Sequence, residues 1–145
     1  NAGQRGAFLH DARDIQTLYG DVLFKYMGWA WSSEMIKRTA SNPVTFSGEL
    51  PPVYILTGMG FNTQLSHYFS NAWEVAARFS WLEPDTKVSH YEPQRSEYTL
   101  GLTRYIYNHK VKVQGNITYG QRQAFGIDGA EKKYLNAQVQ VELGI

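Results

Sequence analysis

The chain contains no cysteine, which excludes a disulfide framework and any metal site built on thiolates. It also lacks an apolar run approaching the ~20 residues that a transmembrane helix needs. No segment carries a sustained apolar stripe with a period of 3.6 residues, so helices are not predicted. The formal net charge is only +1, which provides no electrostatic argument for nucleic acid as a partner. At 145 residues the chain is long enough for one domain, residues 1–145, and offers no case for two.

In place of helical periodicity, the chain shows strict alternation. The last thirteen residues, KYLNAQVQVELGI, put apolar side chains at every second position up to Ile145. A period of two sends alternate side chains to opposite faces of a β-strand. Six further segments alternate in the same way, at residues 15–27, 29–37, 60–70, 73–82, 96–107 and 110–119. The pattern predicts an all-β protein with seven antiparallel strands.

The connections between these segments alternate between tight and long. Tight turns are predicted around Gly28, at Ser70-Asn71 and at Asn108-His109, where Asn and Gly supply hairpin-turn chemistry. Long polar connections cover residues 38–52, 83–95 and 120–132. Outer-membrane β-barrels have short periplasmic turns and longer extracellular loops. The rhythm therefore predicts a transmembrane β-barrel whose last strand descends toward the periplasm.

Aromatic residues gather near the ends of the predicted strands. Tyr105 and Tyr107 lie near the tight turns, and Tyr98 and Tyr134 near the long loops. Membrane barrels carry aromatic girdles at both interfaces, although aromatic residues also favour strands in general. We expect six aromatic residues to lie at the lipid interface: Tyr26, Trp29, Phe69, Trp73, Trp81 and Tyr119.

Arg104 fits this pattern less well than its neighbours. It shares the parity of Leu100 and Leu102 and should therefore face lipid, where an arginine at the midplane would cost roughly 2–4 kcal/mol. Two explanations stay open from the sequence. Either its long side chain reaches the nearby interface, or a bulge at Thr103 reverses the parity.

The alternate strand positions that carry polar side chains would form the wall of a pore, and they include both basic and acidic residues. Charged residues lining a constriction set ion selectivity. These charges could create a transverse field or simply pair with one another, for example Glu74 with Arg78. The candidate lumen-facing residues are Arg78, Lys110, Lys112, Lys25, Glu74 and Glu34.

Four phrases resemble, in order and spacing, the C-terminal half of Bacteroidota-type members of the phosphate-selective porin O and P family. They are GFNTQLSHYF, NAWEVAARFSWLEPD, EYTLGLTRYIYNHKVKVQGNITY and NAQVQVELGI. The match covers residues 60–145 well and 15–37 more loosely. The resemblance implies a 16-stranded outer-membrane barrel of a Gram-negative bacterium, often trimeric. It also implies outer-membrane lipid, other outer-membrane proteins and small anionic or polar solutes as partners. With an anion preference implied, Arg78, Lys110 and Lys112 become the candidate anion contacts.

The chain departs from the family in two ways. It ends in Ile145, where members usually end in an aromatic residue, and it carries seven predicted strands instead of sixteen. Bacterial single-chain barrels use even strand numbers of eight or more, and seven strands would leave two unpaired edges in lipid. We therefore expect this sequence to be the C-terminal portion of a longer protein.

Two other functions stay open. A soluble carrier of the lipocalin type has a similar length, with apolar side chains facing inward around a ligand. A complete eight-stranded membrane barrel with a structural or adhesive role would need an eighth strand within residues 1–14, which show no sustained alternation. An enzyme, a cofactor or a metal site is not expected, because the four histidines are scattered without ligand spacing.

Overall fold

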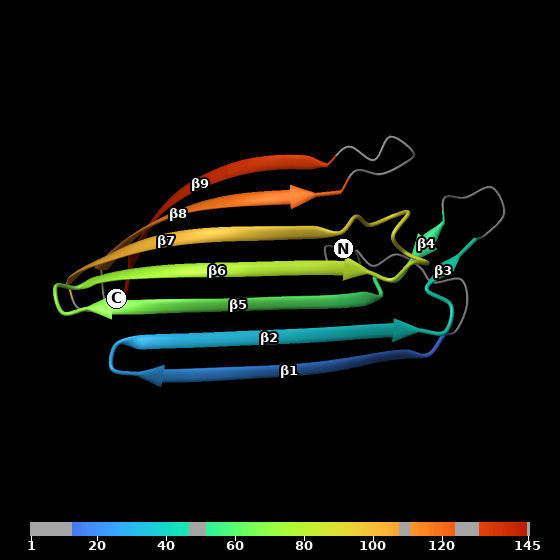
Figure 1. Cartoon of the computed structure of the whole chain (residues 1–145), viewed down its shortest axis with the longest axis horizontal. Helices are drawn as coiled ribbons and strands as arrows, with labels where there is room; N and C mark the ends of the chain where they lie inside the picture. The colour runs from blue at the N-terminus through green and yellow to red at the C-terminus, as the bar shows by residue number, and fades with distance from the viewer. Residues whose placement is uncertain (1–12, 47–51, 108–110, 124–130, 145) are drawn as a thin grey trace.

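The computed structural model describes residues 13–46, 52–107, 111–123 and 131–144, and among these residues it contains no helix that could span a membrane. Seven long strands follow one another along the chain (Figure 1). A two-stranded hairpin lies within the first long connection, formed by β3 (Val44–Thr45) and β4 (Val53–Tyr54). The long strands are β1 (Ile15–Tyr26), β2 (Trp29–Ala40), β5 (Gly58–Phe69), β6 (Trp73–Pro84), β7 (Arg95–Tyr107), β8 (Val111–Arg122) and β9 (Lys132–Leu143).

These seven strands form one antiparallel sheet in the order β1-β2-β5-β6-β7-β8-β9. Each strand pairs with the next long strand of the chain, so the sheet is a simple meander. Within the described residues β1 and β9 are its two edges, and the sheet is not closed. The predicted all-β antiparallel fold is confirmed, while its closure into a barrel stays a prediction.

The strands run further into the long connections than the alternation indicates. β2 continues to Ala40, β6 to Pro84 and β8 to Arg122, each two or three residues past the predicted end. Backbone pairing needs no apolar side chain, so strands continue where alternation has stopped. The predicted loop at residues 38–52 likewise contains the β3–β4 hairpin, whose strands of two residues each are too short to show a period.

The β1–β2 and β5–β6 hairpins turn in two and three residues, respectively. Met27 and Gly28 both have positive φ angles, of 44° and 82°, as a type I′ turn requires. Ser70 to Ala72 form a longer turn in which the Ala72 N–H donates to Phe69 O at 3.1 Å and Ala72 has φ 64°. The predicted turn at Asn108-His109 lies outside the described residues.

Register divides the sheet into an apolar face and a polar face, because directly opposed residues of an antiparallel pair share a face. One row of the apolar face runs across all seven strands, through Phe24, Trp31, Leu65, Ala77, Leu100, Ile117 and Ala137. The corresponding row of the polar face runs from β2 to β9, through Ser32, Gln64, Arg78, Thr99, Thr118 and Asn136.

Among the described residues, no protein layer packs on the apolar face. Leu135 and Val139 of β9 are 72% and 80% exposed, and large apolar side chains of the other long strands are exposed as well. Among the described residues the one fully buried apolar side chain is Val88, in the connection between β6 and β7. The part of the chain that the structure describes therefore has no hydrophobic core on this sheet, which is unusual for a soluble protein.

A candidate pore wall on the polar face

The polar face is hollowed into a groove of about 370 Å³. Residues of five neighbouring strands, β5 to β9, line this single groove, so the sheet curves around its polar side. Amide and hydroxyl side chains predominate, with two charged residues of the candidate set among them. The polar side chains of the groove belong to Gln64, Glu74, Arg78, Ser80, Glu97, Thr99, Thr103, Gln114, Asn116, Thr118, Gln138 and Gln140.

Arg78 lies in the middle of this groove. Its cross-strand neighbours are Gln64 and Thr99, and its Nε donates to Gln64 Oε1 at 3.0 Å. The suggested Glu74–Arg78 ion pair is wrong, because residues four apart on a strand lie roughly 13 Å from each other. Glu74 instead accepts a hydrogen bond from the Tyr105 hydroxyl at 2.6 Å. Arg78 therefore has the Gln64 amide beside it and forms no ion pair with any of the described carboxylates.

The other candidate residues are spread along the polar face. Lys112 forms an ion pair with Glu142 of β9, with 2.9 Å between Nζ and Oε2. Lys25 and Glu74 line a separate hollow of about 410 Å³ near the tight turns. Glu34 lines another, of about 360 Å³, toward the long connections. Lys110 lies outside the described residues.

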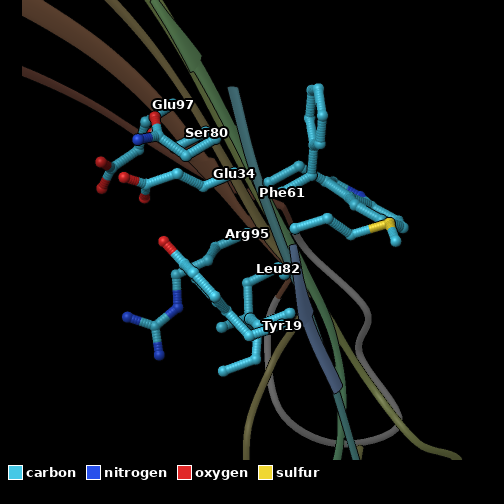
Figure 2. A pocket seen from close by; sticks show the side chains of 12 residues that line it. Tyr19, Glu34, Phe61, Ser80, Leu82, Arg95 and Glu97 are labelled. Carbon is cyan, nitrogen blue, oxygen red and sulfur yellow. The ribbon is translucent and has the colours of Figure 1, made fainter. Parts of the chain in front are cut away.

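Two rows of like charge near the long connections were not predicted from the sequence. Arg95, Arg122 and Lys132 are directly opposed on β7, β8 and β9. The adjacent row carries Asp21 opposite Glu34, with Glu97 further across the same row. Figure 2 shows Glu34, Ser80, Glu97, Arg95 and Tyr19 on one side of the sheet and Phe61 on the other. Only the register brings these charges together, so the alternation within a single strand could not have revealed them.

The Tyr134 side chain crosses the polar face instead of joining an interfacial girdle. Its hydroxyl donates to Glu97 Oε1, and its ring lies against Gly120, where a Cβ atom would overlap the ring. Tyr105 also lies on the polar face, bonded to Glu74. These two tyrosines, which the sequence places near strand ends, each direct the hydroxyl to a carboxylate on the groove side of the sheet.

The six aromatic residues expected at a lipid interface all lie on the apolar face. Tyr26 opposes Trp29 and Phe69 opposes Trp73 beside the two tight turns. Trp81 opposes Phe61, and Tyr119 opposes Tyr98, toward the long connections. They form two bands at opposite ends of the apolar face.

Arg104 also lies on the apolar face, so the parity does not reverse at Thr103. Thr103 remains in register with Gln114 on the polar face, and the irregularity comes later, between Tyr105 and Tyr107. The Arg104 guanidinium carbon lies 5.1 Å from the centre of the Trp73 ring, and its Nη1 donates to Asn71 O in the β5–β6 turn. Of the two explanations, the side chain that reaches toward the interface fits the structure.

The long connections after β2 and β6 pack on each other at one end of the sheet. The Tyr54 and Tyr91 rings stack with 5.3 Å between their centres, and the Tyr54 hydroxyl donates to Glu92 Oε2 at 3.3 Å. Glu92 also forms an ion pair with Arg95, the first residue of β7. Burial and the Glu92 carboxylate raise the pKa of Tyr54, so its hydroxyl remains a donor at neutral pH. These contacts place an ordered cluster next to the basic row.

Comparison with known proteins identifies no relative: the chain matches no family model, no curated protein and no solved structure. Across the described residues, no group of three or more His, Asp or Glu side chains is arranged to hold a metal ion. Any functional assignment therefore depends on the chemistry of the two faces of the sheet.

Proposed function

We propose that the chain forms seven strands of an outer-membrane β-barrel that acts as a porin for small hydrophilic solutes. One observation carries the proposal: the described residues form an antiparallel sheet with an exposed apolar face and a concave polar face, and with no core on either side. In lipid, closed β-barrels satisfy all backbone polar groups while turning apolar side chains outward. The polar groove then becomes part of the wall of an aqueous lumen.

The height of the apolar band supports this orientation. Trp73 and Trp81 mark its two ends on β6 and are eight residues apart. At ~3.4 Å per residue they are separated by roughly 27 Å along the strand. A strand tilt of about 40° reduces this to roughly 21 Å along the membrane normal, close to the ~25 Å apolar band of outer-membrane barrels. Lys37 and Glu83 share the apolar face just beyond Trp81, where headgroups begin.

The lipocalin-type alternative needs the opposite curvature. In such a carrier the apolar side chains face the enclosed cavity and the polar ones face water. Here the groove is lined by Gln, Thr, Asn and charged side chains. The eight-stranded alternative depends on residues 1–14, of which 1–12 lie outside the described residues. Closure of the proposed barrel requires strands other than the seven described, from the same protein or from further copies.

An anion preference is part of the proposal and is supported by the basic side chains of the polar face. Arg78 projects into the groove and forms no ion pair with any described residue. Arg122 and Lys132 lie toward the long connections beside Arg95, whose charge is paired with Glu92. Cationic side chains along a pore favour anions. We assign the transported class as small anions, with phosphate the specific solute that the family resemblance suggests.

Planar bilayers test the proposal directly. The intact protein that carries this chain, refolded in detergent and added to a lipid bilayer, should produce stepwise ion conductance. The same detergent with heat-denatured protein is the control. A protein that stays monodisperse in detergent-free buffer and gives no conductance steps would contradict the porin assignment.

A further inference from the structure

Arg104 is an isolated charge on an otherwise apolar part of the sheet. Its row consists of Phe69, Trp73, Val113 and Val141, and the next row toward the middle of the sheet contains Trp29, His67 and Leu102 among its members. Within the described residues of these two rows there is no aspartate or glutamate. Among the described residues the Arg104 cation therefore has no carboxylate partner on its own face.

The position of Arg104 along the strand determines which environment it meets. It opposes Trp73, the first residue after the β5–β6 turn, and its guanidinium reaches the Asn71 carbonyl in that turn. In an outer-membrane barrel such tight turns lie on the periplasmic side. The energetic penalty of an arginine on the lipid face falls to about 0–1 kcal/mol near the interface. Arg104 thus lies at the depth of the lipid headgroups.

Aromatic side chains hold the guanidinium in place without neutralising it. Trp73 lies under it at 5.1 Å, which is a cation–π distance. The cluster continues with Trp29, His67 and Phe69. The His67 ring centre lies 4.4 Å from that of Trp29 and 4.6 Å from that of Phe69. A guanidinium carries five N–H donors in a planar fork that matches the oxygens of a phosphate. One donor is used by Asn71, and the fork is positioned to bind a second acceptor.

We propose that Arg104, with Trp73 beneath it, binds the phosphate of an anionic phospholipid in the periplasmic leaflet. Charge complementarity carries this assignment, because a cation without a carboxylate partner at headgroup depth meets phosphate as its available counter-ion. The site lies on the opposite face from the groove and so takes no part in solute passage. The inference rests on the proposed membrane insertion.

Lipid selectivity in vesicles is the test. The intact protein is reconstituted with brominated phosphatidylglycerol or brominated phosphatidylcholine, and quenching of tryptophan fluorescence reports the relative binding constants of the two lipids. We expect wild-type protein to prefer phosphatidylglycerol by about fivefold, since one basic residue near an anionic surface contributes about 1 kcal/mol. Arg104→Gln should reduce the ratio to about one, and Arg104→Lys should retain part of it because a point charge remains.

Lys133→Gln is the matched control, because Lys133 lies on the same face at the other end of the sheet and its charge is already paired with Glu131, with 3.5 Å between Nζ and Oε2. This control should keep the wild-type ratio. An unchanged ratio in Arg104→Gln would overturn the inference while leaving the porin proposal intact if conductance persists. Loss of the preference on adding inorganic phosphate would also overturn it, since the site would then bind free anions. Failure of wild-type protein to insert would instead contradict the proposed function.

Discussion

The partners of a basic side chain on the polar face determine how strongly its charge acts on a passing ion, and Arg78 is an example. Two basic residues of the candidate set differ in their partners. Lys112 forms an ion pair with Glu142, whereas Arg78 donates a hydrogen bond to the neutral amide of Gln64. A paired charge presents a weak net field to a passing ion. Arg78 is therefore the stronger candidate for selectivity within the groove.

Arg78→Gln should lower the anion-to-cation permeability ratio of the pore. A unit charge about 7 Å from a permeating ion contributes roughly 0.6 kcal/mol in water, which is a factor of about two to three. Reversal potentials across a salt gradient measure the ratio. The double variant Lys112→Gln with Glu142→Gln removes a neutral pair and should leave it unchanged. An equal shift in both variants would exclude a special role for Arg78.

Gly120 and Tyr134 show how two neighbouring strands are fitted to each other. The Tyr134 ring of β9 lies against Gly120 of β8, and its hydroxyl reaches Glu97 on β7. Aromatic cover of a strand glycine is a known way to fix register. The contact joins three strands on one side of the sheet.

Gly120→Ala should destabilise the sheet by about 0.5–1.5 kcal/mol, because the added methyl group displaces the Tyr134 ring and removes its hydrogen bond to Glu97. Urea unfolding in detergent or vesicles measures the change. Gly101→Ala is the control, since a Cβ atom there meets its nearest neighbours at an ordinary 3.9 Å. Adding Tyr134→Ala to the Gly120→Ala variant should relieve the overlap. If Gly101→Ala and Gly120→Ala behave alike, the close contact does not determine stability.

At the scale of elements, the sequence predicts that the seven strands exist and roughly where they lie, but it does not predict where they end. All seven predicted segments correspond to long strands, because a period of two is a local property of each segment. β2, β6 and β8 were predicted too short because alternation ends before backbone pairing does. The β3–β4 hairpin was missed, since two residues cannot display a period.

The whole molecule is an open sheet with two long edges, β1 and β9, within the described residues. Each edge exposes a row of backbone N–H and C=O groups, and such groups cannot remain unpaired in lipid. The proposed function therefore requires that both edges find partner strands. This requirement concerns the assembled protein and can be tested without knowing which polypeptide supplies the partners.

Amide hydrogen exchange of the intact protein in vesicles should show β1 and β9 as strongly protected as the central strand β6. Paired backbone groups of a closed barrel exchange slowly, whereas an open edge exchanges fast. Mass spectrometry of peptides from each strand gives the comparison, with the same protein unfolded in denaturant as the fast-exchanging reference. Rapid exchange confined to β1 and β9 would show that the sheet stays open in the membrane.

The sequence by itself determined that the protein is all-β, where its seven long strands lie and which side chains of each strand share a face. These properties follow from a two-residue period that every strand carries alone. The tertiary structure decided which residues of different strands oppose one another. It thereby assembled the basic row of Arg95, Arg122 and Lys132, laid Tyr134 over Gly120 and directed Arg104 to its turn. It also made the polar face concave, because curvature arises from strands packed side by side and has no signature within any one of them.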